Sequence, residues 1–386
     1  MKLFPKIAIT AHHSIGALGA SSEEVWQNYQ QFKTKITLNE AGDFVGTLSD
    51  ENLDLILKLR NENPHYASLD NSVLFAIFSA RKVYQSAGWK PTDVFGINIG
   101  SSRGATTLFE EHHQFFLENK YAQTLASPNS TLGNIASWVS HDLQHSGPEI
   151  SHSITCSTAL HALLNGVAWL KAGLVDKFLV GGSEAPLTSF TLAQMKALKI
   201  YSREKNSEFP CRSLDFEKKN NSMVIGEGAA MICLEHENTE KALAHIISMG
   251  YATEMLQHPT SISAEAICFQ KSMQMALEEI DLHEIDAIVM HAPGTLKGDA
   301  SEFEAIKKVF GENVPILTSN KWLLGHTFGA SGMFSVEMAL LMLQNQIFIP
   351  VPFQNQIPES KKLRKIMVNA VGFGGNAVSV VLEKNG

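Results

Sequence analysis

Cysteine, positive charge and long apolar runs are all scarce in this sequence, and each shortage excludes a class of protein. The 386 residues include four cysteines, and none are paired at the spacing of a metal site or a disulfide framework. Lysine and arginine total 31 against 39 aspartates and glutamates, so the net charge is −8. That balance argues against broad nucleic-acid binding, which requires a basic surface. We expect no metal and no nucleic-acid partner, and a reducing, cytoplasmic location.

No segment of the sequence predicts insertion into a membrane. The longest apolar candidate, residues 333–343, is interrupted by Glu337 and is typical of a buried helix. The first six residues lack the apolar run of a signal peptide. We therefore expect a soluble chain.

The remaining composition and patterning favour a large α/β protein. Hydrophobic residues make up 44% of the chain, and short β-prone runs alternate with helical patterns, which predicts α/β layers around buried sheets. A polar segment at 235–241 separates two stretches of similar pattern. In each, a strand leads through a polar joint into a long helix, followed by a strand, a glycine turn and a further strand. This predicts a duplicated fold with an N-terminal half at 1–240 and a C-terminal half at 241–386.

A cysteine of the N-terminal half falls at a junction between two predicted elements. Residues 150–156 begin as a β-prone run, and residues 160–170 carry apolar side chains at helical spacing, so Cys156 stands between strand and helix. Helix N–H groups and the helix dipole would favour its thiolate, as in a nucleophile. On this stretch alone a buried structural cysteine is the commoner explanation, and the other polar sites decide between the two.

Three polar side chains of the C-terminal half, His291, Lys321 and His326, also stand at predicted strand ends or tight loops. A cysteine with two histidines suits acyl transfer. One imidazole can hold charge that develops on an acyl oxygen, while the other assists a proton or enolate step. Lys321 would add a positive charge or a hydrogen-bond donor. The Gly374–Gly375 turn could bring backbone N–H groups to a substrate oxygen, although a plain tight turn explains it equally well.

The order of these sites resembles that of the elongating β-ketoacyl-acyl-carrier-protein synthases, in the thiolase-like superfamily. The motifs that carry the resemblance span nearly the whole chain. They are Thr155-Cys156-Ser157, Gly181-Gly182-Ser183-Glu184, Gly226-Glu227-Gly228-Ala229, His291 through Gly298-Asp299 to Glu302, Asn320-Lys321 with Gly325-His326, Gly329-Ala330-Ser331-Gly332 with Glu337, and Gly372-Phe373-Gly374-Gly375.

The resemblance implies a thiolase-like αβαβα fold with two pseudo-symmetric halves, and a role for each matched residue. Cys156 would be acylated, His291 and His326 would promote decarboxylation and hold the enolate oxygen, and Lys321 would support them electrostatically. Phe373 would be a gate, and its N–H with that of Cys156 would form the oxyanion hole. Supporting roles would fall to residues that brace loops or contact the pantetheine arm: Thr295, Glu302, Glu337, Gly374 and Gly375.

The implied reaction is a decarboxylative Claisen condensation of an acyl thioester with malonyl-acyl carrier protein, without cofactor or metal. The implied pathway is fatty acid synthesis or a specialised polyene or polyketide route. The implied partners are acyl and malonyl carrier proteins and a second chain, in a homodimer or in a heterodimer with a related ketosynthase. Residues 103–109 are our candidates for reaching across that dimer.

Some positions depart from the family pattern, and three other classes of protein would carry different site residues. Pro293 stands where a second threonine is usual, Ala292 replaces a glycine, and Asn376-Ala377 replaces threonine-asparagine, which affects the expected pantetheine contacts. A thiolase would need a second cysteine in the loop that carries Phe373. An initiating synthase would use Cys-His-Asn. A non-catalytic chain-length factor typically lacks the cysteine.

Overall fold

A computed structural model describes residues 6–204, 207–236, 240–255, 263–353 and 362–385. Its main feature is a ten-stranded mixed sheet in the order β11-β10-β12-β13-β9-β1-β8-β6-β4-β5. The strands of the first half are β1 (Ile7–Gly16), β4 (Gly96–Gly100), β5 (Glu149–Ile150), β6 (Lys177–Glu184) and β8 (Gly228–His236). Those of the second half are β9 (Ala244–Thr253), β10 (Ala287–Val289), β11 (Ile316–Thr318), β12 (Lys365–Gly372) and β13 (Asn376–Lys384).

The two halves of the sheet share one topology. Read outward from the centre, each has its first strand, then its fifth, fourth, second and third. In each half the fifth strand runs antiparallel to the fourth, and the second, third and fourth are parallel. The halves join where β1 pairs with β9 through three residue pairs, from Ile7 with Ile246 to Ile9 with Ala244. The predicted duplication is therefore confirmed in the strand order.

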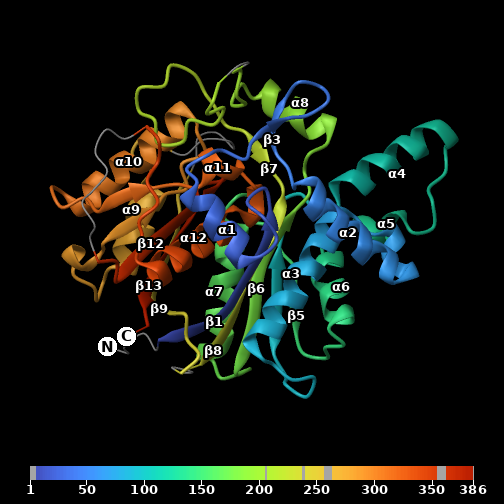
Figure 1. Cartoon of the computed structure of the whole chain (residues 1–386), viewed down its shortest axis with the longest axis horizontal. Helices are drawn as coiled ribbons and strands as arrows, with labels where there is room; N and C mark the ends of the chain where they lie inside the picture. Colours follow the sequence, from blue (N-terminus) through green and yellow to red (C-terminus); the bar gives the residue numbers. More distant parts are fainter. Residues whose placement is uncertain (1–5, 205–206, 237–239, 256–262, 354–361, 386) are drawn as a thin grey trace.

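Helices cover both faces of each half and fill the space between the halves (Figure 1). In the middle, α7 (Thr158–Lys171) packs against α12 (Ser331–Asn345). The outer helices are α3 (Asn71–Ala87) and α6 (Asn134–Asp142) on the first half, and α9 (Ile267–Ala276) and α10 (Leu296–Phe310) on the second. With each five-stranded half of the sheet counted as one layer, the order of layers is helix, sheet, helix, sheet, helix. This confirms the predicted αβαβα arrangement.

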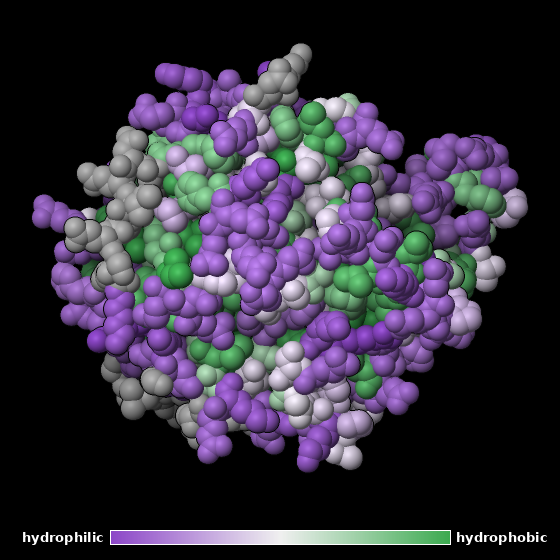
Figure 2. Space-filling model, viewed as in Figure 1, coloured by the Kyte–Doolittle hydropathy of each residue, from purple (hydrophilic) through white to green (hydrophobic). Residues whose placement is uncertain are grey.

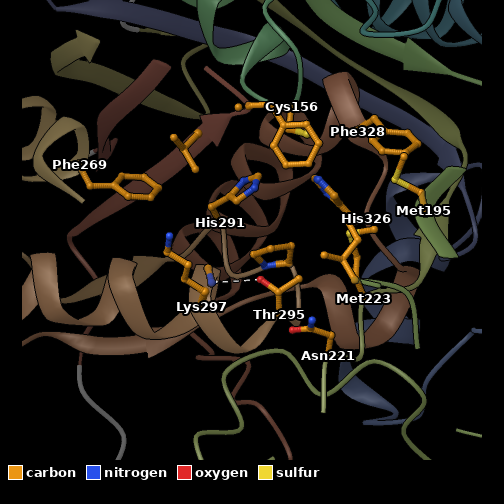
Figure 3. A pocket seen from close by; sticks show the side chains of 16 residues that line it. Cys156, Met195, Asn221, Met223, Phe269, His291, Thr295, Lys297, His326 and Phe328 are labelled. Atoms are coloured by element: carbon orange, nitrogen blue, oxygen red, sulfur yellow. Dashed lines mark hydrogen bonds between the residues drawn. The ribbon is translucent and has the colours of Figure 1, made fainter. Parts of the chain in front are cut away.

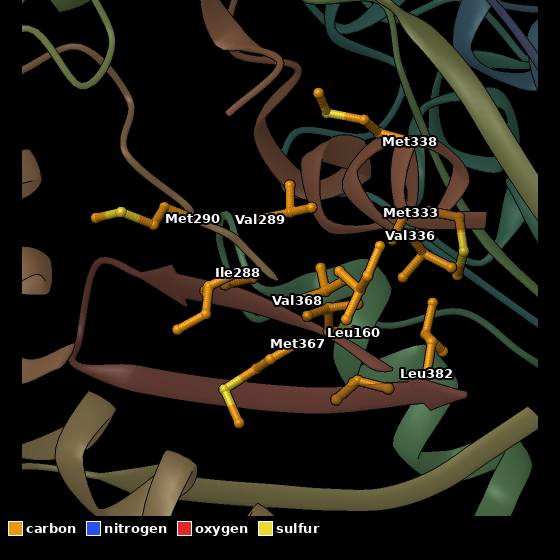
Figure 4. Close-up of a cluster of buried hydrophobic side chains, with 14 of the residues drawn as sticks. Leu160, Ile288, Val289, Met290, Met333, Val336, Met338, Met367, Val368 and Leu382 are labelled. Carbon is orange, nitrogen blue, oxygen red and sulfur yellow. The ribbon is translucent and has the colours of Figure 1, made fainter. Parts of the chain in front are cut away.

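Alternation along the strands produces these layers. On β6, Phe178 and Val180 belong to the core around α7 and α12, whereas Leu179 belongs to the core around α3. Helix α12 is buried around its whole circumference from Ser331 to Leu343, as expected for a helix between two sheets. Figure 4 shows Met333 and Val336 of α12 facing side chains from α7, β10, β12 and β13, while Met338 projects from the opposite side of the helix.

Local sequence sets the ends of α3. The side chain of Asp70 accepts a hydrogen bond from the N–H of Ser72 at the start, and Gly88, with φ +67°, ends the helix. Two helices, two strands and a 3-10 helix lie between β1 and α3. The elements before α3 are α1 (Ser22–Gln30), β2 (Thr37–Leu38), β3 (Phe44–Gly46), α2 (Asp50–Glu62) and η1 (Pro64–Ser68).

Polar side chains dominate the visible surface (Figure 2). Smaller elements lie around the sheet ends. They are α4 (Thr106–Asn119), α5 (Ala126–Ser130), α8 (Ser189–Ala197), β7 (Ile225–Gly226), η2 (Leu282–Glu284), α11 (Lys321–Leu324) and η3 (Phe328–Ala330). Strands β2, β3 and β7 form a separate small sheet. In the described part of the chain, no helix is long and apolar enough to cross a membrane.

Candidate active site

A cavity of about 210 Å³ brings together side chains from both halves of the chain. Cys156 comes from the turn before α7, His291 from the end of the β10 strand, His326 from the loop after α11, and Phe373 from the β12–β13 turn. Figure 3 shows the two imidazoles lying side by side close to Cys156. Residues that are up to 217 positions apart in sequence, from 156 to 373, thus line one space.

The turn that carries Cys156 is strained and closely tied down. Thr155 has φ +47°, a left-handed conformation that is costly for a β-branched residue. Three hydroxyl contacts hold the turn: Thr158 Oγ1 donates to the Thr155 carbonyl at 2.5 Å and accepts from Ile154 N at 2.8 Å, and Ser157 Oγ donates to the Ile154 carbonyl at 3.0 Å. The cysteine is therefore presented by a fixed backbone.

The glycine loop of the C-terminal half packs directly against this turn. A Cβ atom on Gly372 would lie 1.8 Å from Thr155 Oγ1 and 3.1 Å from the backbone nitrogen of Cys156. Thr155 Oγ1 also donates to the carbonyl of Phe373 at 3.1 Å. Only glycine fits at 372. This approach places the Phe373 backbone beside the Cys156 N–H, where the sequence expected an oxyanion hole.

Burial controls the ionisation of Cys156. The side chain is 8% exposed. Burial, and then the nearby Glu184, raise the pKa of Cys156 to about 12, while Lys321 and Arg103 lower it. The expectation that helix N–H groups and the dipole favour the thiolate is wrong, because burial shifts the pKa of Cys156 in the opposite direction.

Glu302 fixes the loop that carries His291. Its two carboxylate oxygens accept from the backbone nitrogens of His291, at 3.0 Å, and Ala292, at 2.9 Å. Burial raises the pKa of Glu302 to about 7, against the lowering effect of these hydrogen bonds. Ala292, with φ +22°, takes an unusual conformation at the position where the family has glycine. The two hydrogen bonds that Glu302 accepts therefore hold this loop to α10.

The two histidines are buried and neutral. Their ring centroids lie 5.1 Å apart with the planes nearly perpendicular. Burial, followed by the charge of Lys321, lowers the pKa of His326 to about 3. Burial and the neighbouring His326 and Lys321 hold the pKa of His291 well below its usual range. At neutral pH each imidazole therefore has one nitrogen that carries a proton and can donate a hydrogen bond, and one unprotonated nitrogen that can accept one.

Lys321 is 1% exposed and lies close enough to both histidines for its charge to lower their pKa. Its Nζ donates to Asn320 Oδ1 at 2.8 Å and to Ser335 Oγ at 3.0 Å. Burial lowers the pKa of Lys321 to about 8, and Glu302, first among several groups, raises it. No carboxylate forms an ion pair with this ammonium in the described ranges, so its positive charge is directed at the site.

Glu337 does not brace a loop of the site, which corrects the sequence expectation. Its carboxylate accepts from Ser14 Oγ at 2.6 Å and lies 3.2 Å from His12 Nδ1. Both partners are on β1, so Glu337 ties α12 to the central strand. The residue of α12 that contacts Lys321 is Ser335, two positions before Glu337. The motif match alone could not distinguish these two positions of the helix.

Thr295 and Phe373 line the cavity, and the paired glycines follow Phe373 in the same turn. Thr295 lines the cavity, and its Oγ1 also caps α10 by accepting from Gly298 N at 3.1 Å. Phe373 lines it too and is 38% exposed, so it is not a buried core plug. Gly374 and Gly375 have φ +99° and +68°, and they make the turn that carries Phe373 possible.

Several lining residues were not singled out from the sequence. They are Met195, Ile200, Asn221, Met223, Phe269, Lys297 and Phe328. Their only sequence signal is apolar or polar character, which most residues of a large protein share. Glu184 was matched without a role. Its Oε1 accepts from Ser102 Oγ at 2.7 Å and from Gly329 N at 3.0 Å, which joins two loops beside Cys156.

Comparison with known proteins agrees with this geometry. The chain matches the model of the β-ketoacyl synthase N-terminal domain over residues 5–240 and that of the C-terminal domain over residues 243–353. It therefore belongs to the β-ketoacyl synthase family. It is 25% identical over 409 residues to 3-oxoacyl-acyl-carrier-protein synthase 2 of Coxiella burnetii, with 98% of each chain covered.

Solved structures share the fold. One holds a type II polyketide synthase acyl carrier protein in complex with its ketosynthase bound to the hexaketide; it is similar with a TM-score of 0.87 and 21% identity, covering 98% of this chain and 99% of that one. The ishigamide ketosynthase/chain length factor gives a TM-score of 0.86 at 19% identity, covering 99% and 100%. At these identities the likeness concerns the thiolase-like architecture.

Substituting Glu302 tests whether it fixes the His291 loop. Glu302→Gln leaves one oxygen for two backbone N–H donors, so we expect the free energy of unfolding to fall by about 1–3 kcal/mol. Urea denaturation should be followed at pH 8, above the pKa of about 7. The matched control is Glu304→Gln on the same helix, where the side chain is 51% exposed and a change within about 0.5 kcal/mol is expected. Equal losses in both variants would contradict the bracing role.

Proposed function

We propose that this chain is an acyltransferase that condenses an acyl thioester with a malonyl thioester held on acyl carrier protein. The observation that carries the proposal is one cavity lined by a buried cysteine and two neutral, buried histidines. Condensation needs a nucleophile that holds the acyl group and donors that stabilise an enolate. Cys156 would supply the first, and His291 and His326 the second.

The first stage transfers the acyl group to the enzyme. Cys156 Sγ attacks the thioester carbonyl, the bond to the carrier's sulfur breaks, and the thiol proton passes to the departing thiolate. The N–H groups of Cys156 and Phe373 would stabilise the oxyanion, supported by the contact of the Gly372 turn with the Cys156 backbone. Because the thiol pKa is raised to about 12, proton loss would accompany attack rather than precede it.

The second stage uses the histidines. The N–H groups of the neutral imidazoles would donate to the thioester oxygen of the malonyl group as carbon dioxide leaves and an enolate forms. The enolate carbon then attacks the carbonyl of the Cys156 thioester, the bond to Sγ breaks, and the β-ketoacyl product leaves. The departing Cys156 thiolate takes up one proton from solvent, which restores the thiol. Lys321 would favour the enolate through its positive charge and would keep the imidazoles uncharged.

Carrier protein and a second chain are the partners that we propose. A structural neighbour is described as a ketosynthase in complex with its acyl carrier protein, and another as a ketosynthase/chain length factor. Either a homodimer or a heterodimer with a related chain fits these neighbours. We further propose that the N-terminal half, 1–240, supplies the nucleophile and the C-terminal half, 241–386, the two histidines, and that the protein acts in the cytoplasm.

A non-catalytic chain-length factor is the second candidate, because a structural neighbour pairs a ketosynthase with one. Cys156 and both histidines are present and converge on the cavity, which favours catalysis. A thiolase is disfavoured because residues 371–377 contain no cysteine.

Replacing the nucleophile is the direct test. Cys156→Ala should lower product formation by about a thousandfold or more, because no sulfur remains to hold the acyl group. Mass spectrometry of the intact protein after incubation with acyl carrier thioesters should show acyl addition to the wild type and none to the variant. Cys268→Ala removes another buried cysteine and should still be acylated. Unchanged condensation by Cys156→Ala would remove this residue from the mechanism.

The titration of Lys321 predicts a pH profile for decarboxylation. The lysine is charged below its pKa of about 8 and loses its charge as the pH rises, so carbon dioxide release from malonyl thioester should decline above pH 8. Cys156→Gln, whose amide imitates the acylated cysteine, isolates this step. The decline should approach about tenfold per pH unit, as for one essential proton.

The control for this profile is Lys321→Met in the same Cys156→Gln background. It should be slower at low pH and should lack the decline near pH 8, because neither histidine titrates there. A decline of unchanged position and depth in this double variant would assign the titration to another group.

The gate is tested by Phe373→Ala. Since the ring is 38% exposed, the substitution should cost less than the roughly 3–5 kcal/mol of a buried Phe→Ala change. It should raise decarboxylation by unacylated enzyme relative to acylated enzyme. Phe269→Ala, at 1% exposure in the same cavity, is the stability control. A large fall in melting temperature for Phe373→Ala with unchanged half-reactions would contradict gating.

A further inference from the structure

The loop Ser101-Ser102-Arg103-Gly104 after β4 has no role in the condensation mechanism, yet it is built against the active site. Ser102 Oγ donates to Glu184 Oε1 at 2.7 Å and accepts from Gly329 N at 2.8 Å. A Cβ on Gly329 would lie 2.7 Å from both Glu184 Oε1 and the Ser102 nitrogen. These contacts fix the loop to the segment that follows His326.

Arg103 projects from this loop beside the catalytic cavity with its donors incompletely used. Its Nη2 donates to Gln194 Oε1 at 2.5 Å, and its guanidinium carbon lies 5.6 Å from the centroid of the Phe328 ring. The Nε donor is buried without a hydrogen-bond partner. Among the described residues no carboxylate forms an ion pair with Arg103. The guanidinium is close enough to Cys156 to lower the pKa of that thiol.

A second hollow begins at Arg103. This groove of about 1090 Å³ lies between α4 and α8 and is lined by Arg103, Phe109, Phe190 and Gln194, among others. Figure 1 shows α4 extending away from the rest of the molecule on this side. Met195, next to Gln194, and Phe328 line the Cys156 cavity and lie together on one side of it in Figure 3. They form the wall between cavity and groove.

We propose that Arg103 selects acyl groups that carry a hydrogen-bond-accepting oxygen, a carboxylate or a ketone, in the part of the chain that leaves Cys156 toward the groove. The inference depends on the proposed function, because it assumes that Cys156 holds an acyl group. It assigns Arg103 a specificity role and leaves the chemical steps to Cys156 and the histidines.

Unpaired donors explain why such selection would be strong. A plain alkyl chain that fills the space past Phe328 covers a guanidinium whose Nε already lacks a partner, and it offers no acceptor in exchange for water. An oxygen-bearing chain satisfies the donor. Sites built to hydrogen-bond a substrate group reject analogues that lack it far better than apolar pockets reject added groups.

The test compares pantetheine thioesters of matched length on the purified enzyme: adipoyl, 5-oxohexanoyl and hexanoyl, with four- and eight-carbon sets. Intact mass measures transfer to Cys156. In this step Sγ bonds to the acyl carbon, the pantetheine C–S bond breaks, and pantetheine leaves with the thiol proton. In the wild type, at least one oxygen-bearing set should acylate about tenfold faster than the alkyl set. The carboxylate and ketone arms identify which oxygen is preferred.

Arg103→Met should abolish this preference and accelerate transfer of alkyl groups. The control is Arg364→Met, which removes an exposed arginine far from Arg103 in the sequence and should leave the preference unchanged. Sedimentation should show the same oligomer for Arg103→Met and the wild type. If assembly changes, Gln194→Leu, which removes the anchor of the guanidinium, should weaken the preference instead.

Equal rates for all three classes at every length, or an unchanged preference in both Arg103→Met and Gln194→Leu, would overturn the assignment. Either result still leaves Cys156 acylated, so the proposed function survives it. Absence of any acylation in the wild type would instead overturn the proposed function and the inference together.

Discussion

The close approach of the glycine turn at 372 to the turn before Cys156 is the contact on which the site depends. A Cβ at Gly372 would overlap Thr155 Oγ1, so the two loops meet only because one residue has no side chain. The contact is also the place where the two halves of the duplicated fold meet beside the nucleophile. Without this contact, Phe373 would not lie near the Cys156 backbone. The side chain of Thr155, whose backbone is strained, would also lose its hydrogen bond to the Phe373 carbonyl.

Burial is the second constraint, and it sets the charges of the site. It disfavours the ionised form of every group there: the thiol of Cys156 stays protonated, and both imidazoles stay neutral. Lys321 is the exception near neutral pH, because its pKa of about 8 keeps it charged. The site therefore combines neutral hydrogen-bond donors with one positive charge. This combination suits a reaction in which negative charge appears on an oxygen and then disappears.

Much of this arrangement could be predicted from the sequence. Periodicity and repeated order indicated the layers and the duplication. Motif order selected Cys156, His291, His326 and Phe373, which line one cavity, and Lys321, whose charge lowers the pKa of both histidines. Two predictions about local environment were wrong. Motif spacing cannot say which way a helical side chain points, so Glu337 was placed in the site when it faces β1. A junction of strand and helix cannot report burial, and burial raises the pKa of the Cys156 thiol, which opposes the thiolate that the sequence pattern favoured. The wall formed by Met195 and Phe328 depends on loops that meet only in the fold.

The raised pKa of Cys156 has a consequence for chemical durability. Peroxides and alkylating reagents attack thiolates, and a thiol held protonated in an 8% exposed position reacts with them slowly. In the proposed mechanism the residue reacts when a thioester carbonyl is held against it and a departing sulfur takes the proton. Under that mechanism the reactivity of Cys156 depends on the bound thioester rather than on the surrounding pH.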